Sequence, residues 1–261
     1  MRNRWMGSLI AMAAVFGIAS VLLLAQAPLR QAQGGEQSRT AARPAAPRAQ
    51  AATTRTPDLS GLWVGSRDGA VFPREAPAMT PPTEETFNYR KNLRGGTRAE
   101  LDPEVLCEPV GLTWLLLSTQ GGNSFVEIIQ SPGRVLMLFE YDHWIRQIWT
   151  DGREHPEDLD LSWMGHSIGK WDGDTLVVDT VGLHSETWLT PTGHPHTDQL
   201  HVVERIRRTD QNTLTMDLTF EDSKMYTKPW GGRLVFKTKP DAEMVERVNC
   251  EDRWLFKTRS Y

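Results

Sequence analysis

Residues 165–182 read GHSIGKWDGDTLVVDTVG, two strand-like runs that are joined by Asp172 and Gly173. An Asp-Gly pair between apolar runs is the strongest short-range signal of a β-hairpin, because it suits a type I′ turn. Residues 213–220 give a second signal, a strict alternation of apolar and polar side chains, which is the period of a half-buried strand. Both stretches predict antiparallel β-sheet.

Similar runs lie on both sides of this hairpin, and turn residues separate them. The other expected strands are 124–130, 134–141, 143–150, 200–208, 213–221, 232–239, 243–249 and a last one at 253–257. Such a series must bury one face and hide its edges, which an up-and-down barrel achieves. We therefore expect an all-β, antiparallel up-and-down β-barrel, with a β-sandwich as the alternative.

The first 57 residues differ from the rest. Arg2 and Arg4 precede an apolar run at residues 6–27, which predicts a signal peptide or an uncleaved membrane anchor over residues 1–27. Residues 28–57 are rich in Ala, Pro, Gln and Arg without apolar periodicity and predict a disordered linker. We expect one β-barrel domain at 58–261, periplasmic or secreted, whose contact with the membrane is through the N-terminal segment if it stays uncleaved.

Residues 66–123 are expected to form a long irregular excursion over the domain. Six prolines interrupt this segment and break any long element. A short helix is expected at about residues 83–93, where Thr83 and the two glutamates after it resemble a capped first turn.

Composition excludes several classes of protein. The chain of 261 residues is 39% hydrophobic and 24% charged, unlike a membrane bundle or a disordered polyelectrolyte. Residues 58–261 hold 22 basic and 32 acidic groups, a charge of −10, which disfavours binding to nucleic acid phosphate. Ten tryptophans indicate an aromatic-lined interior. In an exported protein Cys107 and Cys250 are expected to form a disulfide.

All seven histidines lie between residues 143 and 204. Two long connections, 151–164 and 183–199, carry several of them and are expected to emerge at one end of the barrel, where loops commonly bind ligands. His194 and His196 project to the same side of an extended chain, so they could hold Zn, Mn or Fe with His166 as a third ligand. Other candidates for the third ligand are His155, His184 and Asp198. A solvated loop and metal-free acid–base chemistry remain alternatives.

Strand parity singles out two charged residues. Within residues 200–207, Glu204 shares a face with apolar neighbours, and Arg146 does so within 143–150. A carboxylate in an apolar interior needs a partner, so an Arg146–Glu204 ion pair is expected inside the barrel, either as a structural plug or as a catalytic pair. Glu140 is a competing partner for Arg146.

Tyr226 and Trp230 lie at the connection before a late strand. Tyr226 is a candidate general acid or hydrogen-bond donor at the mouth of a pocket, and Trp230 a candidate stacking wall. The alternative is an aromatic pair that covers the end of the barrel.

Four runs, at 151–156, 165–180, 195–197 and 226–230 (the last reading YTKPW), resemble a family of exported, uncharacterised bacterial proteins. The likeness extends from about Asp58 to Asn249 and includes both cysteines. It implies export and a single β-domain, brings no activity, and directs attention to a set of polar and aromatic residues: Arg153, His155, His166, His196, Tyr226 and Trp230. Residues 61–63, GLW, also resemble the Gly-x-Trp start of lipocalin-like barrels.

The leading hypothesis is an extracytoplasmic barrel that binds a small apolar or aromatic molecule in a Trp-rich pocket with a His-rich mouth. The ligand contacts would be Arg146, Arg153, His155 and Trp230. The alternative is a lyase, isomerase or hydrolase acting on such a molecule, with or without a divalent metal, and with His166, His196, Glu204 and Tyr226 as catalytic residues. A third hypothesis is an interaction module with a filled barrel.

Overall fold

A computed structural model describes residues 56–72, 77–95, 102–122 and 124–245. The expected signal or anchor, most of the linker, Cys250 and the strand expected at 253–257 lie outside the described residues, so the disulfide stays a prediction. No helix in the described ranges is both long enough and apolar enough to cross a membrane.

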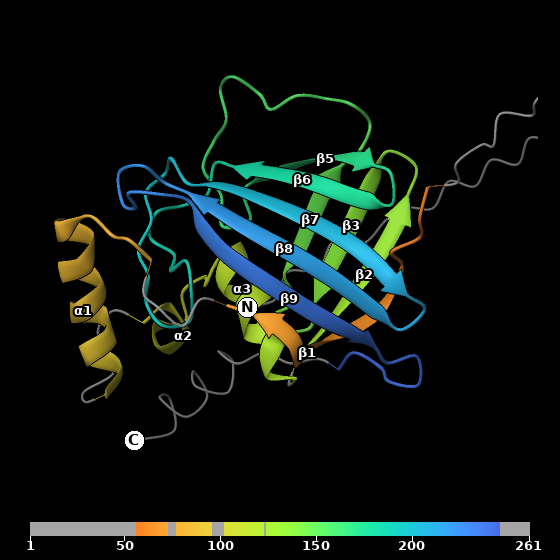
Figure 1. Ribbon diagram of the computed structural model, residues 1–261, viewed down its shortest axis with the longest axis horizontal. Helices are drawn as coiled ribbons and strands as arrows, with labels where there is room; N and C mark the ends of the chain where they lie inside the picture. Colours follow the sequence, from red (N-terminus) through yellow and green to blue (C-terminus); the bar gives the residue numbers. More distant parts are fainter. Residues whose placement is uncertain (1–55, 73–76, 96–101, 123, 246–261) are drawn as a thin grey trace, which may run out of the picture. The chain divides into compact units, whose positions relative to one another are not determined.

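Nine strands close into a barrel in which each strand lies beside its neighbours in sequence, and β9 returns to β1 (Figure 1). The strands are β1 (Gly61–Val71), β2 (Phe125–Ser131), β3 (Arg134–Phe139), β4 (Ile145–Trp149), β5 (His166–Asp172), β6 (Thr175–Val181), β7 (His201–Asp210), β8 (Thr213–Glu221) and β9 (Trp230–Thr238). The expected barrel is confirmed. One neighbouring pair departs from the antiparallel pattern, because β4 and β5 run parallel.

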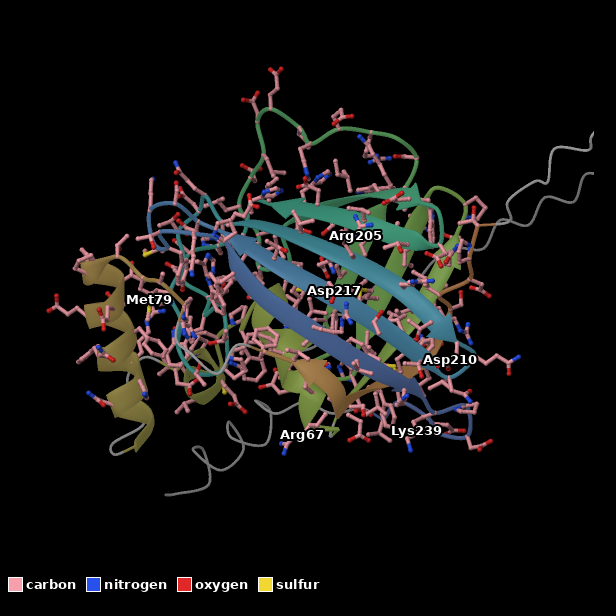
Figure 2. All side chains as sticks on the ribbon, viewed as in Figure 1. Arg67, Met79, Arg205, Asp210, Asp217 and Lys239 are labelled. Atoms are coloured by element: carbon pink, nitrogen blue, oxygen red, sulfur yellow. The ribbon has the colours of Figure 1, made fainter. Side chains whose placement is uncertain are left out.

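The two sequence signals account for the most regular part of the barrel. Asp172 and Thr175 are paired across the Asp-Gly turn between β5 and β6, and Gly173 has the positive φ of 62° that this turn requires. On β8 the apolar positions of residues 213–220 are buried in the barrel. Charged side chains such as Arg205 on β7 and Asp217 on β8 lie on the outer face (Figure 2).

The parallel contact between β4 and β5 follows from the long connection over residues 150–165. This segment leaves the end of β4 and returns to the start of β5, so Ile148 pairs with Ser167 in parallel register. Its last part meets the second long connection, because the Ser162 amide donates to the Gly182 carbonyl at 2.9 Å. The two histidine-bearing connections therefore touch, but they do not emerge at one end of the barrel as expected, because the first begins beside Gly133 at the other end.

The excursion between β1 and β2 is more helical than expected. The helix expected near 83–93 is present as α1 (Pro81–Gly95), and it is followed by α2 (Pro103–Leu106), α3 (Leu112–Ser118) and the 3₁₀ turn η1 (Thr119–Gly121). The side chains of Leu112, Trp114, Leu115 and Leu116 in α3 join the same core as the inward residues of the barrel. At the other end of the chain, residues 243–245 are not in a strand, unlike the expected strand at 243–249.

The segment that precedes β1 packs against the end of the barrel that carries the turn between β2 and β3. Leu59 and Trp63 are fully buried, and the Trp63 indole donates to the Leu59 carbonyl at 3.1 Å. Arg208 from β7 lies 5.2 Å from the Trp63 ring and donates to the Asp58 carbonyl at 3.1 Å. The start of the domain is thus fixed to the barrel by a tryptophan and an arginine.

Candidate functional site

A buried ion pair joins Arg146 on β4 to Glu204 on β7, as strand parity predicted. Arg146 Nη1 donates to Glu204 Oε1 at 2.9 Å, and Nη2 also contacts Oε2. Arg146 Nε donates to Ser167 Oγ at 3.2 Å, and Nη2 also donates to Thr180 Oγ1 at 3.0 Å. Glu140 is not the partner, since its carboxylate accepts from the amides of Phe125 and Val245.

This ion pair has the character of a structural plug. The side chains of Arg146 and Glu204 are 1% and 0% exposed, and neither residue lines the cavity beside Trp171 or three other surface cavities among the described residues. A pair with every donor directed at protein atoms has no group left over for a substrate. Its two partners therefore hold the interior of the barrel together.

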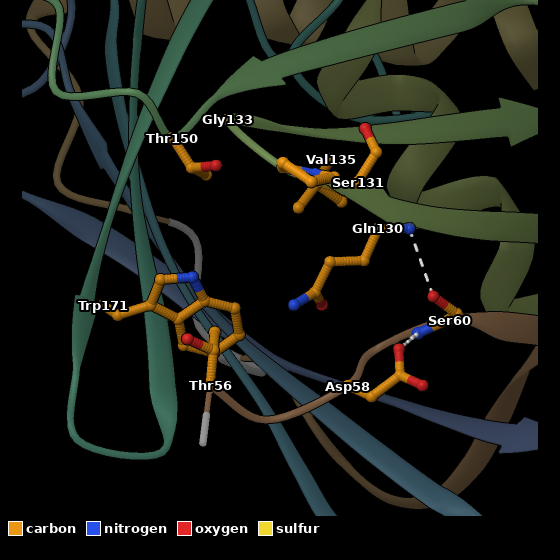
Figure 3. Close-up of a pocket in the computed structure, with 10 residues that line it drawn as sticks. Thr56, Asp58, Ser60, Gln130, Ser131, Gly133, Val135, Thr150 and Trp171 are labelled. Carbon is orange, nitrogen blue, oxygen red and sulfur yellow. Dashed lines mark hydrogen bonds between the residues drawn. The ribbon is translucent and has the colours of Figure 1, made fainter. Parts of the chain in front are cut away.

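A cavity of about 500 Å³ opens at the end of the barrel that carries the β2–β3 turn (Figure 3). Trp171 near the end of β5 forms one wall, and Gln130 and Val135 face it from β2 and β3. The described lining residues are Thr56, Asp58, Ser60, Gln130, Ser131, Pro132, Gly133, Val135, Thr150 and Trp171.

The Gln130 side chain fixes the wall that the N-terminal segment provides. Its Oε1 accepts from the Leu59 amide at 3.1 Å, and its Nε2 donates to the Pro57 carbonyl at 3.0 Å. The Gln130 amide also donates to Ser60 Oγ at 3.1 Å. These bonds hold the segment in place before any ligand arrives.

The expected pocket and the observed cavity differ in composition. Trp171 is the one tryptophan, and no histidine occurs, among the described residues that line the cavity. The histidine-bearing connection 183–199 lies at the other end of the barrel, where it joins the end of β6 to the start of β7. A Trp-rich pocket with a His-rich mouth is therefore not what surrounds this cavity.

An aromatic cluster occupies the end of the barrel at the 183–199 connection. The His194 ring stacks on Phe87 of α1 with 4.1 Å between centroids and lies 5.1 Å from Trp230. Trp230 also contacts Tyr226 at 5.3 Å. The Tyr226 hydroxyl donates to the Pro195 carbonyl at 2.7 Å, and burial together with the charge of Asp222 raises its pKa. Tyr226 and Trp230 thus cover the barrel end.

His196 is occupied on both ring nitrogens. Its Nε2 lies 2.8 Å from Thr187 Oγ1 and its Nδ1 lies 2.8 Å from the Thr197 carbonyl. Burial lowers the pKa of His196 despite the nearby carbonyl and the charge of Asp222. A neutral imidazole held between two fixed partners is a structural element of the connection.

The expected metal site at His166, His194 and His196 is not assembled. His194 Nδ1 contacts Thr190 Oγ1 at 2.6 Å, whereas His166 Nδ1 contacts His155 on the outer face at 2.7 Å. Across residues 56–72, 77–95, 102–122 and 124–245, no three His, Cys, Asp or Glu side chains are placed to hold a metal ion. Projection to one side of the chain did not bring the rings together, because hydroxyls of the connection bind each ring separately.

Three histidines, His155, His166 and His201, instead belong to a row of side-chain contacts across the outer face of the barrel. His155 Nδ1 lies 2.7 Å from His166 Nδ1, and His155 Nε2 lies 3.2 Å from Asp179 Oδ1. The same Asp179 oxygen lies 2.9 Å from His201 Nε2, and His201 Nδ1 lies 3.3 Å from Glu221. Five titratable side chains from four strands and the 150–165 connection therefore share one chain of contacts.

The pKa values of two histidines in this row, His166 and His201, are shifted in opposite directions. Partial burial, followed by the charges of His155 and Arg153, lowers the pKa of His166. Partial burial also acts against a charged His201, but the hydrogen bonds and charges of Asp179 and Glu221 outweigh it and raise the pKa of His201. His155 and His166 were predicted as site residues from the sequence. Asp179, His201 and Glu221 were not, although outward parity on paired strands would have grouped them.

Arg153 lies beside the row on the outside of the barrel. Its guanidinium stacks 3.5 Å from the Trp149 ring, and its Nε donates to Asp151 at 2.9 Å. The side chain is 42% exposed and does not line the cavity beside Trp171.

No protein-family model matches the sequence, and a search of curated proteins gives no significant match.

Proposed function

We propose that this protein binds a small molecule with a flat, partly polar ring in the cavity beside Trp171. The observation that carries the proposal is the cavity itself, about 500 Å³ at one end of a filled barrel. Small-molecule sites commonly enclose roughly 300–1,000 Å³ and combine an aromatic surface with a few fixed polar groups. The indole of Trp171 and the hydroxyls around it supply both.

The lining supports a more polar ligand than the apolar molecule that composition alone suggested. Thr56, Ser60, Ser131 and Thr150 bring hydroxyl groups to the cavity, and Trp171 offers a ring face (Figure 3). The hydrogen bonds of Gln130 hold the N-terminal wall in advance, so binding costs less ordering of the protein. A ring would stack on Trp171 while its polar edge meets the hydroxyls.

Export remains part of this proposal and rests on the sequence of residues 1–27. An exported barrel would meet its ligand in the periplasm or outside the cell.

Isothermal titration calorimetry with nicotinamide, catechol and guanosine tests the proposal. We expect at least one of these compounds to bind with Kd below about 1 mM, which corresponds to roughly 4 kcal/mol. Trp171→Leu should abolish that binding because it removes the stacking surface. Trp149→Leu is the matched control, since Trp149 lies outside the cavity and stacks on Arg153.

Two results would contradict the proposal. One is that none of the three compounds binds to the wild-type protein below about 10 mM. The other is that a compound binds equally well to the wild type and to Trp171→Leu.

A further inference from the structure

We infer that Arg90, His194 and Trp230 form a second binding site, which takes the carboxylate of a small aromatic acid. The site lies where α1 meets the 183–199 connection, at the barrel end opposite the cavity beside Trp171. It is independent of the proposed function, because none of its three residues lines that cavity.

Each of the three residues has a buried nitrogen without a partner. Arg90 Nη1, His194 Nε2 and Trp230 Nε1 are removed from solvent and make no hydrogen bond within the described part of the chain. His194 as a whole is 9% exposed. A buried polar group left without a partner costs about 1–3 kcal/mol, so three such groups in one cluster indicate a missing partner rather than a chance defect.

Several contacts place the three residues in one cluster. The rings of His194 and Trp230 are 5.1 Å apart. A Cβ atom on Gly193, the residue before His194, would lie 3.0 Å from Arg90 Cβ. The Arg90 guanidinium lies 5.4 Å from the Trp188 ring, and its charge acts on the titration of Tyr226.

All three nitrogens are donors. His194 Nδ1 lies 2.6 Å from Thr190 Oγ1 and 3.1 Å from Thr192 Oγ1, so two hydroxyl groups are placed to donate to it. Burial and then the charge of Lys91 lower the pKa of His194 to about 4, which leaves the ring neutral at pH 7. When a hydroxyl donates to Nδ1, the single proton of the ring is on Nε2. Indole and guanidinium nitrogens only donate, so the missing partner is an acceptor.

The charge of the site calls for an anion. Arg90 remains a cation at neutral pH although burial lowers its pKa, and no carboxylate pairs with it among the described residues. The nearby Asp222 is committed elsewhere, because it accepts from the amides of Thr197 at 2.6 Å and Lys224 at 3.1 Å. A carboxylate offers two oxygens that match the fork of an arginine.

The surroundings of the donors are aromatic. Phe87 and Trp188 are 8% and 2% exposed, and Tyr226 is 2% exposed. Such walls suit the flat apolar body of an aromatic acid and exclude a large hydrated anion. Of the described side chains of α1, Thr83 and Phe87 are the buried ones, and Phe87 forms the wall that stacks on His194.

Calorimetric titration of the full chain with benzoate tests the inference, and benzyl alcohol serves as the neutral probe of similar shape. We expect benzoate to bind at pH 7 and benzyl alcohol to bind at least about tenfold more weakly, because a hydrogen bond to a charged group contributes about 1.5–3 kcal/mol. Arg90→Met should weaken benzoate binding by about tenfold to a hundredfold. Arg134→Met is the matched control, since Arg134 is exposed on β3.

Trp230→Phe keeps an aromatic side chain but replaces the indole, N–H included, with a smaller phenyl ring, so it tests the donor even if Arg90→Met fails to fold. We expect it to weaken benzoate binding, and we expect the indole N–H resonance of Trp230 to shift when benzoate is added to the wild type. The inference is overturned if benzoate fails to bind below about 10 mM, if benzyl alcohol binds as tightly, or if Trp230→Phe binds benzoate unchanged.

Discussion

Glu204→Gln should destabilise the barrel strongly, because it removes the charge that balances Arg146. The glutamine keeps the shape of the side chain, but its amide N–H₂ group would face the guanidinium that now donates to both carboxylate oxygens. Arg146 is 1% exposed, so water cannot replace the lost partner. Breaking one side of a buried ion pair costs about 3–5 kcal/mol.

Urea unfolding followed by tryptophan fluorescence measures this loss. For a domain of this size about 3 kcal/mol corresponds to a fall in Tm of roughly 6–12 °C. Asp217→Asn is the control, because it neutralises one partner of an exposed ion pair with Arg233 at 2.6 Å. Exposed pairs contribute about 0–1 kcal/mol, so the control should lose little.

Replacement of both partners separates charge imbalance from lost packing. In Arg146→Met with Glu204→Leu, no charge is left unpaired, and Ser167 and Thr180 can bond to each other because their oxygens are already 2.9 Å apart. We expect the double variant to recover most of the stability lost in Glu204→Gln. The reasoning is refuted if Glu204→Gln loses less than about 1 kcal/mol or if the double variant is no more stable than the single one.

Three further predictions concern other parts of the chain. A raised folded-state pKa stabilises the protein below the unfolded pKa of about 6.5 and loses this contribution as pH rises through the folded value, so His201→Gln should lower the free energy of unfolding at pH 5 more than at pH 9 in urea titrations; an equal loss at both pH values would contradict this. Tyr226→Phe removes the hydrogen bond to Pro195 and should cost about 1 kcal/mol, again by urea unfolding; an unchanged midpoint would contradict it. Gly65→Ala should prevent folding or cost at least about 2 kcal/mol, because the added Cβ would overlap the Thr119 carbonyl; a circular dichroism melt that matches the wild type would disprove it.

Local pattern in the sequence was enough for the parts of the fold that depend on neighbouring residues. The Asp-Gly turn located the β5–β6 hairpin, and two-residue periodicity placed Arg146 and Glu204 in the interior, from which their pairing followed. The parallel contact of β4 and β5 was missed because the length of a connection does not determine whether the next strand runs parallel or antiparallel to the previous one. Helix α3 was missed because LTWLLLS is apolar on every side and has no helical period.

The candidate sites were harder to predict, since they depend on what each loop contacts. His194 and His196 are only two residues apart in sequence, yet separate threonine hydroxyls hold them. The cavity beside Trp171 depends on how the segment before β1 crosses the barrel, which Gln130 decides through tertiary hydrogen bonds. Unpartnered donors cannot be read from a sequence at all, because they are defined by the absence of a neighbour in space.

The seam between β4 and β5 is held by side chains more than by backbone. Two residue pairs, Ile148 with Ser167 and Trp149 with Ile168, are in register there, a short ladder compared with those of the other strands. The guanidinium of Arg146 on β4 donates to Ser167 on β5, Thr180 on β6 and Glu204 on β7. Its side chain therefore links β4 to the three strands that follow it. Transient opening of the barrel should begin between β4 and β5. Amide protons on these two strands should exchange with solvent soonest when the hydrogen bonds of Arg146 are removed by substitution.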